Sequence, residues 1–232
     1  MTEKLPLIRI HKRAKHIILR HDPFKGFILT MNAHSQMQRA LQLWREFLSS
    51  SAKGPSKELY HPALIALGAM MPFQGKEYRI QKSENVLLRK VELTPPEQGV
   101  TLGNMLICPR VKNPQKTIKE FFYHTAYEVL HGKSSDAAAK AGVCFEKIVI
   151  KDMKSRWGSC SKSGNLSYSW RILMAPEPVI EYLCAHEVAH LIHFDHSKAF
   201  WQVVESLCPN AKEKRKWLKE NGAQLMRYQF DV

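Results

Sequence analysis

The sequence predicts an α+β protein whose strands are concentrated in the first half of the chain and whose helices dominate the second half. Up to about residue 112, short apolar or alternating segments are separated by turn-forming residues, which is typical of strands. From residue 113 onward, apolar residues recur at intervals of three and four, which indicates amphipathic helices. We therefore expect a β-rich N-terminal lobe over 1–112 and a helical lobe over 113–232, joined as one continuous unit.

The N-terminal lobe begins with two expected strands, over 7–20 and 26–31, with the segment HDPFKG as the turn between them. A helix is expected over 33–48, because its large apolar residues are three or four positions apart. The segment 49–62 is rich in serine, lysine, proline and glycine and is the clearest expected loop. Further short strands are expected over 77–81, 85–93 and 104–111.

The C-terminal lobe begins with a helical pattern over 114–141, for which we expect a break near Gly132. A strand follows over 145–153, and a turn at 162–165 joins SRWGSCS to LSYSWRILM as a hairpin whose second strand runs toward Pro176. The remaining residues are expected to be helical, over 176–193, 197–208 and 212–225.

Composition restricts the possible functions. Lysine and arginine outnumber acidic residues by 35 to 21, so nucleic acid is a possible partner, although the basic clusters lie far apart and match no base-reading motif. Five cysteines without a CxxC pair argue against a disulfide framework and an all-cysteine zinc site. The start of the chain lacks a secretory signal, and no run of about 18 apolar residues predicts a membrane span. A cytoplasmic protein without membrane contact is therefore expected.

A polar motif interrupts an otherwise apolar helix in the last third of the chain. The segment CAHEVAHLIHFDHSKAFW, residues 184–201, carries four histidines and two acids, which are costly to bury without a purpose. His186 and His190 are four residues apart, so a helix stacks them on one face within reach of a single ion. Glu187 beside them can hold a water molecule bound to that ion. This HExxH pattern predicts a metal site.

A catalytic zinc site needs a third protein ligand, and two histidines compete for that position. His193 lies about one turn beyond His190 on roughly the same face of the helix. His196 lies ten residues after His186, where the chain can leave the helix and approach the metal from the side. We prefer His196, because a third consecutive ligand on a straight helix would be displaced along the helix axis.

The segment after His196 reads as a helix capped by Ser197, with Phe200 and Trp201 as buried scaffold that holds the loop carrying His196. Asp195 has two interpretations that the sequence leaves open. It can orient a ligand imidazole as a hydrogen-bond acceptor, or it can cap the helix.

The residues SRWGSCS at 155–161, followed by LSYSWRILMAPEPVIEYLCAHEVAHLIHFDHSKAFW, resemble the signature of the YgjP-like family of zinc-dependent metallopeptidases. That family is similar in turn to the SprT/Spartan-type DNA-associated proteases. The resemblance implies a zincin-like fold, with His186, His190 and His196 as zinc ligands and Glu187 as the catalytic glutamate. It does not extend to the metzincins, because His193 replaces the glycine of their longer motif.

These residues predict a Zn²⁺-dependent hydrolase, most directly a metallopeptidase that acts on a peptide or protein substrate. Three neutral imidazoles leave the zinc its full charge, which lowers the pKa of a bound water from 15.7 toward about 7. Glu187 would take the proton of that water and pass it to the leaving group. A second oxyanion donor is also needed, and Arg156, Ser159 and Tyr182 are the candidates.

Two other interpretations remain open at this point. In one, the chain is a basic nucleic-acid-binding protein in which a closed, four-ligand zinc site only stabilises the fold. In the other, a protease is recruited to DNA by its basic surface, which combines the charge with the family resemblance.

Overall fold

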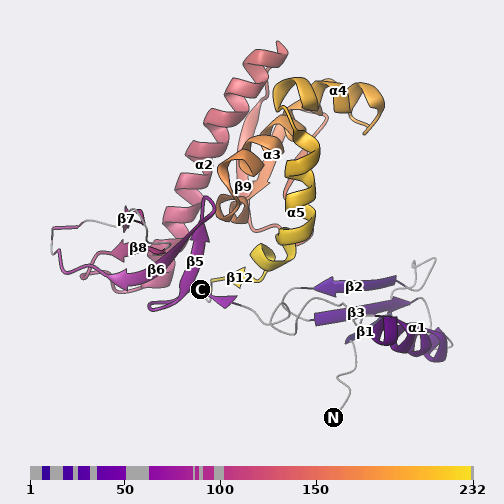
Figure 1. Ribbon diagram of the computed structural model, residues 1–232, viewed down its shortest axis with the longest axis horizontal. Helices are drawn as coiled ribbons and strands as arrows, with labels where there is room; N and C mark the ends of the chain where they lie inside the picture. The colour runs from indigo at the N-terminus through magenta and orange to yellow at the C-terminus, as the bar shows by residue number, and fades with distance from the viewer. Residues whose placement is uncertain are drawn as a thin grey trace. The chain divides into compact units, whose positions relative to one another are not determined.

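The computed structural model describes residues 7–10, 18–22, 26–31, 36–50, 63–85, 87–88, 91–96 and 102–230. These residues form five α-helices and a series of short strands, so the chain has the mixed α and β structure that the sequence predicts (Figure 1). The chain divides into two compact units, Met1–Ala63 and Leu64–Val232. The expected boundary between residues 112 and 113 falls inside the second unit, and the division into lobes stays a prediction.

The first unit combines a three-stranded sheet with one helix. Strand β3 (Gly26–Met31) is central, parallel to β1 (Leu7–Ile10) and antiparallel to β2 (Ile18–Asp22). Helix α1 (Met37–Ser50) follows β3, close to the expected helix. The single strand expected over 7–20 is thus two separate strands, and most of the expected loop, residues 51–62, lies outside the described residues.

The second unit begins with a four-stranded sheet in the order β5-β6-β8-β7. Its strands are β5 (Met70–Phe73), β6 (Lys76–Lys82), β7 (Val91–Thr94) and β8 (Leu102–Ile107). Strands β5 and β6 form a hairpin whose two turn residues, Gln74 and Gly75, both have positive φ angles of 49° and 77°. Such angles match the right-handed twist of paired strands, which explains a tight turn here.

Helix α2 (Pro114–Ala141) is the longest element and packs along α3 (Glu177–Ala189) (Figure 1). It starts where the Asn113 side chain accepts a hydrogen bond from the Lys116 amide, and it ends at Gly142 with a φ of 66°. A stripe of buried residues at four-residue spacing faces the core: Ile118, Phe122, Ala126, Leu130, Ser134 and Ala138. This stripe explains why the segment is helical.

The break expected near Gly132 is wrong, because α2 continues through that residue. A Cβ added at Gly132 would meet no atom within 4 Å, so the glycine accommodates no neighbour. One glycine costs a helix only about 1 kcal/mol relative to alanine, which the buried stripe easily offsets.

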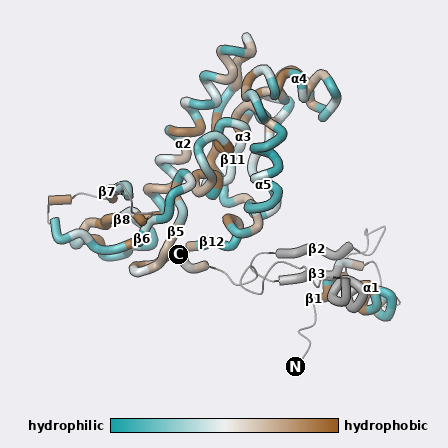
Figure 2. Tube along the Cα trace, in the orientation of Figure 1, coloured by the Kyte–Doolittle hydropathy of each residue, from teal (hydrophilic) through white to brown (hydrophobic). Residues whose placement is uncertain are grey.

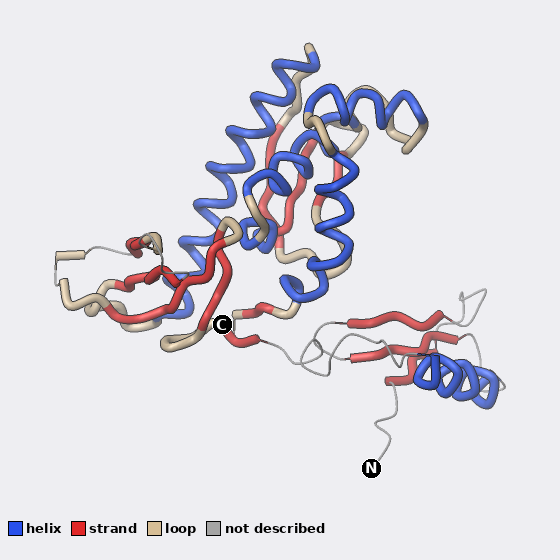
Figure 3. Tube along the Cα trace, in the orientation of Figure 1, coloured by secondary structure: helices blue, strands red, loops and turns tan. Residues whose placement is uncertain are grey.

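A small sheet in the order β10-β11-β9 lies alongside α2 and α3, as the red strands of Figure 3 show. Strand β11 (Asn165–Ser169) is central, parallel to β9 (Lys147–Lys151) and antiparallel to the edge strand β10 (Gly158–Cys160). The expected hairpin of β10 and β11 is confirmed. Its second strand is shorter than expected, because the fully buried segment Trp170–Met174 forms the 3₁₀ helix η3.

The last third is helical, as expected. Helix α3 is followed by α4 (Lys198–Leu207) and α5 (Ala211–Met226). Helix α3 lies between α2 and α5, and the hydropathy colours of Figure 2 turn to teal along α5, which is a more polar surface element. None of the helices in the described part of the chain is both long and apolar enough to cross a membrane.

Two contacts tie the ends of the second unit together. Near its start, β4 (Ala63–Leu64) pairs with β12 (Tyr228–Gln229), and the Ile65 amide donates to the Gln229 carbonyl oxygen at 3.1 Å. The buried guanidinium of Arg171 in η3 forms an ion pair with Asp152 and also donates to the carbonyl oxygen of Tyr228. The chain after α5 is therefore fixed against the same core that supports α3.

Candidate metal centre

The start of α3 is held in place by the tip of the β5–β6 hairpin. The amide of Gln74 donates to the Leu173 carbonyl oxygen at 2.6 Å, and the amide of Gly75 donates to the Met174 carbonyl oxygen at 3.3 Å. A Cβ added at Gly75 would lie 3.0 Å from the Cα of Pro176, so this close approach requires glycine. The hairpin thus fixes the residue at which α3 begins.

Helix α3 presents a mixed face of histidine and glutamate to the loop that follows it. His186 lies within the helix, and His190 is the residue directly after its last turn. The chain then turns, and His196 comes back from the loop before α4. One ring nitrogen from each of these three histidines lies within 4.8 Å of the other two, a grouping of metal-ligand type.

The spacing of these nitrogens fits a small tetrahedral cation. The Nε2 atoms of His186 and His196 are 3.3 Å apart. Two nitrogen ligands at about 2.05 Å from a tetrahedral zinc ion lie about 3.3 Å from each other. Two neutral imidazole nitrogens at this distance either share a proton or present both lone pairs to a common cation. The buried Nδ1 of His186 has no hydrogen-bond partner among the described residues.

His190 is oriented by a hydrogen bond to the backbone of His193, the histidine that competes with His196 for the third ligand position. Its Nδ1 is 3.0 Å from the carbonyl oxygen of His193, which can only accept, so Nδ1 carries the proton and Nε2 keeps its lone pair. The imidazole of His193 is not part of the three-histidine group. Asp195 accepts from the Ser197 amide at 3.2 Å, which favours the capping role over contact with a ligand ring.

Phe200 lies against all three histidines. Its ring centroid is 5.0 Å from that of His186, 4.5 Å from that of His190 and 4.8 Å from that of His196. The Phe200 side chain is fully buried, and its helix is capped by Ser197, whose Oγ accepts from the Phe200 amide at 3.3 Å. Sequence periodicity identified Phe200 as scaffold but gave no signal that its ring contacts all three histidines.

A stack of rings extends this support to α5. Trp201 stacks on His196 with ring centroids 5.9 Å apart, and the Arg215 guanidinium lies 4.5 Å from the centroid of the Trp201 ring. A cation over an indole face is attracted by the ring quadrupole. The expected scaffold role of Trp201 therefore includes a direct contact with the histidine of the loop.

Two of the histidines, His186 and His190, are held in the neutral form that a metal ligand requires. Burial, together with the neighbouring His190 and His196, lowers the pKa of His186 to about 3. Burial also lowers the pKa of His190, although its hydrogen bond to the His193 carbonyl acts in the opposite direction. Both rings consequently present lone pairs at neutral pH.

Glu187 lies on α3 between the two helical histidines and points against the edge strand β10. Its side chain is only 4% exposed, and burial raises its pKa to about 8 against the opposing effect of Arg156. A Cβ added at Gly158 of β10 would lie 2.7 Å from Cδ and 2.8 Å from Cγ of Glu187. The absence of a side chain at Gly158 therefore makes room for this carboxylate, a role that sequence reasoning missed.

The three candidate oxyanion donors lie in different settings. Tyr182 is buried one turn before His186, with ring centroids 5.9 Å apart, and burial raises its pKa to about 12, so its hydroxyl stays protonated. Ser159 is half-buried on β10, next to Gly158. Arg156 is exposed and acts electrostatically on Glu187.

Comparison with known families assigns the chain to a family. The chain matches the family described as "YgjP-like, metallopeptidase domain" over residues 15–221, which is most of its length. The chain belongs to the YgjP-like metallopeptidase family. The resemblance recognised from the sequence is thereby confirmed, and the chain is a metallopeptidase that acts on protein or peptide substrates.

Among solved structures, the chain is similar to the metallopeptidase zymogen of Pyrococcus abyssi abylysin. The two are 26% identical, the match covers 39% of this chain and 93% of that one, and the TM-score is 0.36. No curated protein matches the chain at a significant level. The YgjP-like family assignment implies a metal ion and gives no support to a nucleic-acid partner.

Proposed function

We propose that this YgjP-like metallopeptidase hydrolyses peptide bonds with one zinc ion held by His186, His190 and His196. The convergence of three imidazole nitrogens carries the proposal. Imidazole suits zinc and several other divalent metals, and three such ligands with a fourth position free are typical of catalytic zinc sites. When bound, zinc supplies a positive charge that polarises the scissile carbonyl and acidifies water.

Glu187 acts as the general base in this proposal. Its carboxylate accepts a proton from the attacking water and passes it to the amide nitrogen that leaves. Arg156 favours the charged form of Glu187, and the carboxylate lies against Gly158 of strand β10. The glutamate is thus fixed by backbone contact, which a base needs in order to transfer a proton repeatedly along one direction.

Tyr182 is our leading candidate for the oxyanion donor among the three residues. Its hydroxyl stays protonated through the physiological pH range and its ring lies beside that of His186. A buried phenol loses little orientation entropy when it donates to a developing negative charge. Ser159 and Arg156 remain the alternatives, and single replacements of the three residues would rank them by their loss in kcat.

Replacing Glu187 with glutamine tests the assignment of the base. Glutamine keeps the shape of glutamate but cannot accept the proton, so zinc content should stay at one ion per chain while peptide hydrolysis falls by about 10²–10⁴-fold. Glu181→Gln is the matched control, because it removes an exposed carboxylate from another face of the same helix. Metal analysis and digestion of a peptide library provide the two readouts. Full turnover by Glu187→Gln would remove Glu187 from the mechanism.

A further inference from the structure

A polar cavity of about 250 Å³ lies between α2, α3 and the turn that joins α4 to α5. Its lining includes the exposed residues Asp136, Lys140 and Glu181, so small solutes can reach it from solvent. Two of its lysines have different partners. Lys133 donates to the carboxylates of Glu177 at 2.7 Å and Glu181 at 2.9 Å.

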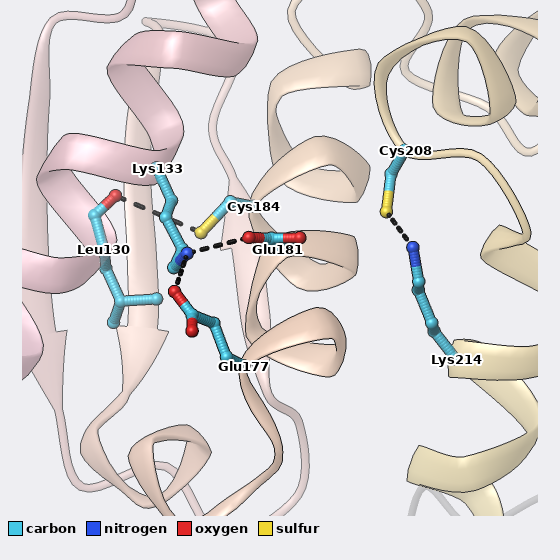
Figure 4. A network of polar contacts seen from close by, with 7 residues as sticks. All are labelled: Leu130, Lys133, Glu177, Glu181, Cys184, Cys208 and Lys214. Atoms are coloured by element: carbon cyan, nitrogen blue, oxygen red, sulfur yellow. Dashed lines mark hydrogen bonds and ion pairs between the residues drawn. The ribbon is translucent and has the colours of Figure 1, made fainter. Parts of the chain in front are cut away.

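Lys214 is directed at a thiol instead. Its Nζ lies 3.1 Å from the Sγ of Cys208 and 2.7 Å from the carbonyl oxygen of Pro209. Figure 4 shows the two side chains pointing toward each other from opposite ends of the turn. Cys208 is only 4% exposed, and its side chain lines the cavity together with that of Lys214.

The turn between α4 and α5 keeps Cys208 and Lys214 close to each other. Cys208 is the residue that ends α4, and Lys214 lies in the first turns of α5. Asn210 and Ala211 lie between these two residues. Their amides donate hydrogen bonds to the Glu205 carboxylate of α4, at 2.8 Å and 3.2 Å. The sulfur and the amine are therefore kept close by backbone contacts that do not depend on either side chain.

We propose that Cys208 and Lys214 are a site of oxidative modification, at which hydrogen peroxide joins Sγ to Nζ through a single oxygen atom. The two atoms are already in contact at 3.1 Å, so a bridge through one oxygen atom needs only a small approach of the two side chains. A thiol beside an amine in a solvent-reached cavity is also placed so that its first oxidation product, a sulfenic acid, lies next to the amine.

The chemistry balances with two molecules of peroxide. The first inserts one oxygen into the S–H bond of Cys208, which gives a sulfenic acid and one water. Lys214 releases one proton to solvent and becomes a neutral amine. The second peroxide takes one hydrogen from the sulfenic O–H and one from the amine N–H, forms the N–O bond and leaves as two waters. Two molecules of a dithiol reverse the bridge: each is oxidised to a disulfide, and together they supply the four hydrogens that restore the thiol and the amine and release the oxygen as water.

The bridge would lock the turn rather than alter the metal centre. Ser197, which follows the ligand histidine, caps the opposite end of α4, about ten residues or about 15 Å along the helix axis. We therefore expect metal content to be the same before and after oxidation, so this site is independent of the proposed catalytic mechanism.

Peptide mapping of the metal-loaded full chain tests the bridge. After peroxide treatment and thiol blocking, trypsin should release residues 199–212, which contain Cys208, linked to residues 213–215, which contain Lys214. The linked species should weigh the sum of the two peptides plus one oxygen and minus two hydrogens. It should vanish on treatment with dithiothreitol, and fragmentation should place the link on the two named residues.

Matched variants decide the assignment. Cys208→Ser and Lys214→Arg should abolish the linked peptide, whereas Lys212→Arg, an exposed lysine on the same helix, should leave the link to Lys214 intact. Exposed Cys144 serves as an internal control that should be oxidised without a lysine link. A direct sulfur–nitrogen link without oxygen, a link that persists in Lys214→Arg, or oxidation of Cys208 to sulfinic acid with no link would each overturn the proposal.

Discussion

Replacing Gly158 with alanine should disable the YgjP-like site without touching any proposed ligand. The new methyl group would lie 2.7 Å from Cδ and 2.8 Å from Cγ of Glu187. Carbon atoms in contact prefer separations of about 3.5–4.0 Å, so the overlap is about 1 Å. Either the strand or the carboxylate must move by that amount.

The carboxylate is the part that moves with least cost, because β10 is paired along its length with β11. The backbone of α3 has little freedom, since Cys184, Val188 and Ala189 around Glu187 are fully buried. Inserting a methyl group into packed surroundings costs about 1–3 kcal/mol of stability. A misplacement of about 1 Å in a reacting group costs about 10²-fold in rate. We expect kcat to fall by about that factor.

The assay is peptide hydrolysis alongside metal content and thermal unfolding. Gly132→Ala is the matched control, because its new methyl meets no atom within 4 Å and lies inside α2. That control should raise the stability by about 0.5–1 kcal/mol and keep full activity. The reasoning is refuted if Gly158→Ala is folded, metal-loaded and as active as the parent chain.

Three further outcomes test the metal centre and its support. Removing the metal with a chelator should stop hydrolysis and lower the unfolding temperature by about 5–10 °C, measured by calorimetry. This shift corresponds to the loss of about 2.7 kcal/mol of stabilisation, which metal binding provides when the metal concentration is a hundredfold above Kd. Phe200→Leu should weaken zinc binding by about 10-fold or more in a competition titration, because one ring contacts all three histidines. Ser197→Ala should cost about 1 kcal/mol in urea unfolding, because it removes the cap of α4.

The helical part of the fold follows closely from the sequence. A four-residue stripe in α2 and the caps at Asn113 and Ser197 set helix positions by local rules alone. The wrong predictions of secondary structure lie where residue spacing does not distinguish one structure from another. The segment Trp170–Met174 is buried on every side, so its apolar run does not distinguish a strand from a 3₁₀ helix.

The candidate site likewise has features that local sequence rules predict and features that they do not. The pairing of His186 with His190 is a property of one helix, so the spacing of the motif is enough to predict it. The preference for His196 over His193 followed from the geometry of a turn after the helix. The group of three histidines in the structure contains His196 and not His193. Contacts between distant segments had no local signal. The space that Gly158 leaves for Glu187 depends on how β10 packs against α3, which no spacing within either segment encodes.

The presence of a buried glutamate beside histidines on α3 has a physical reason. Burial alone drives Glu187 toward its neutral form, since its pKa rises to about 8, and a protonated carboxyl cannot act as a base. Arg156 opposes this shift but is exposed to solvent, which screens its charge. A cation held by the three imidazoles, as proposed, would be a stronger local charge and would favour the carboxylate form of its neighbour. The proposed metal would therefore supply the charge that keeps this deeply buried glutamate ionised, which links the three histidines and Glu187 in one mechanism.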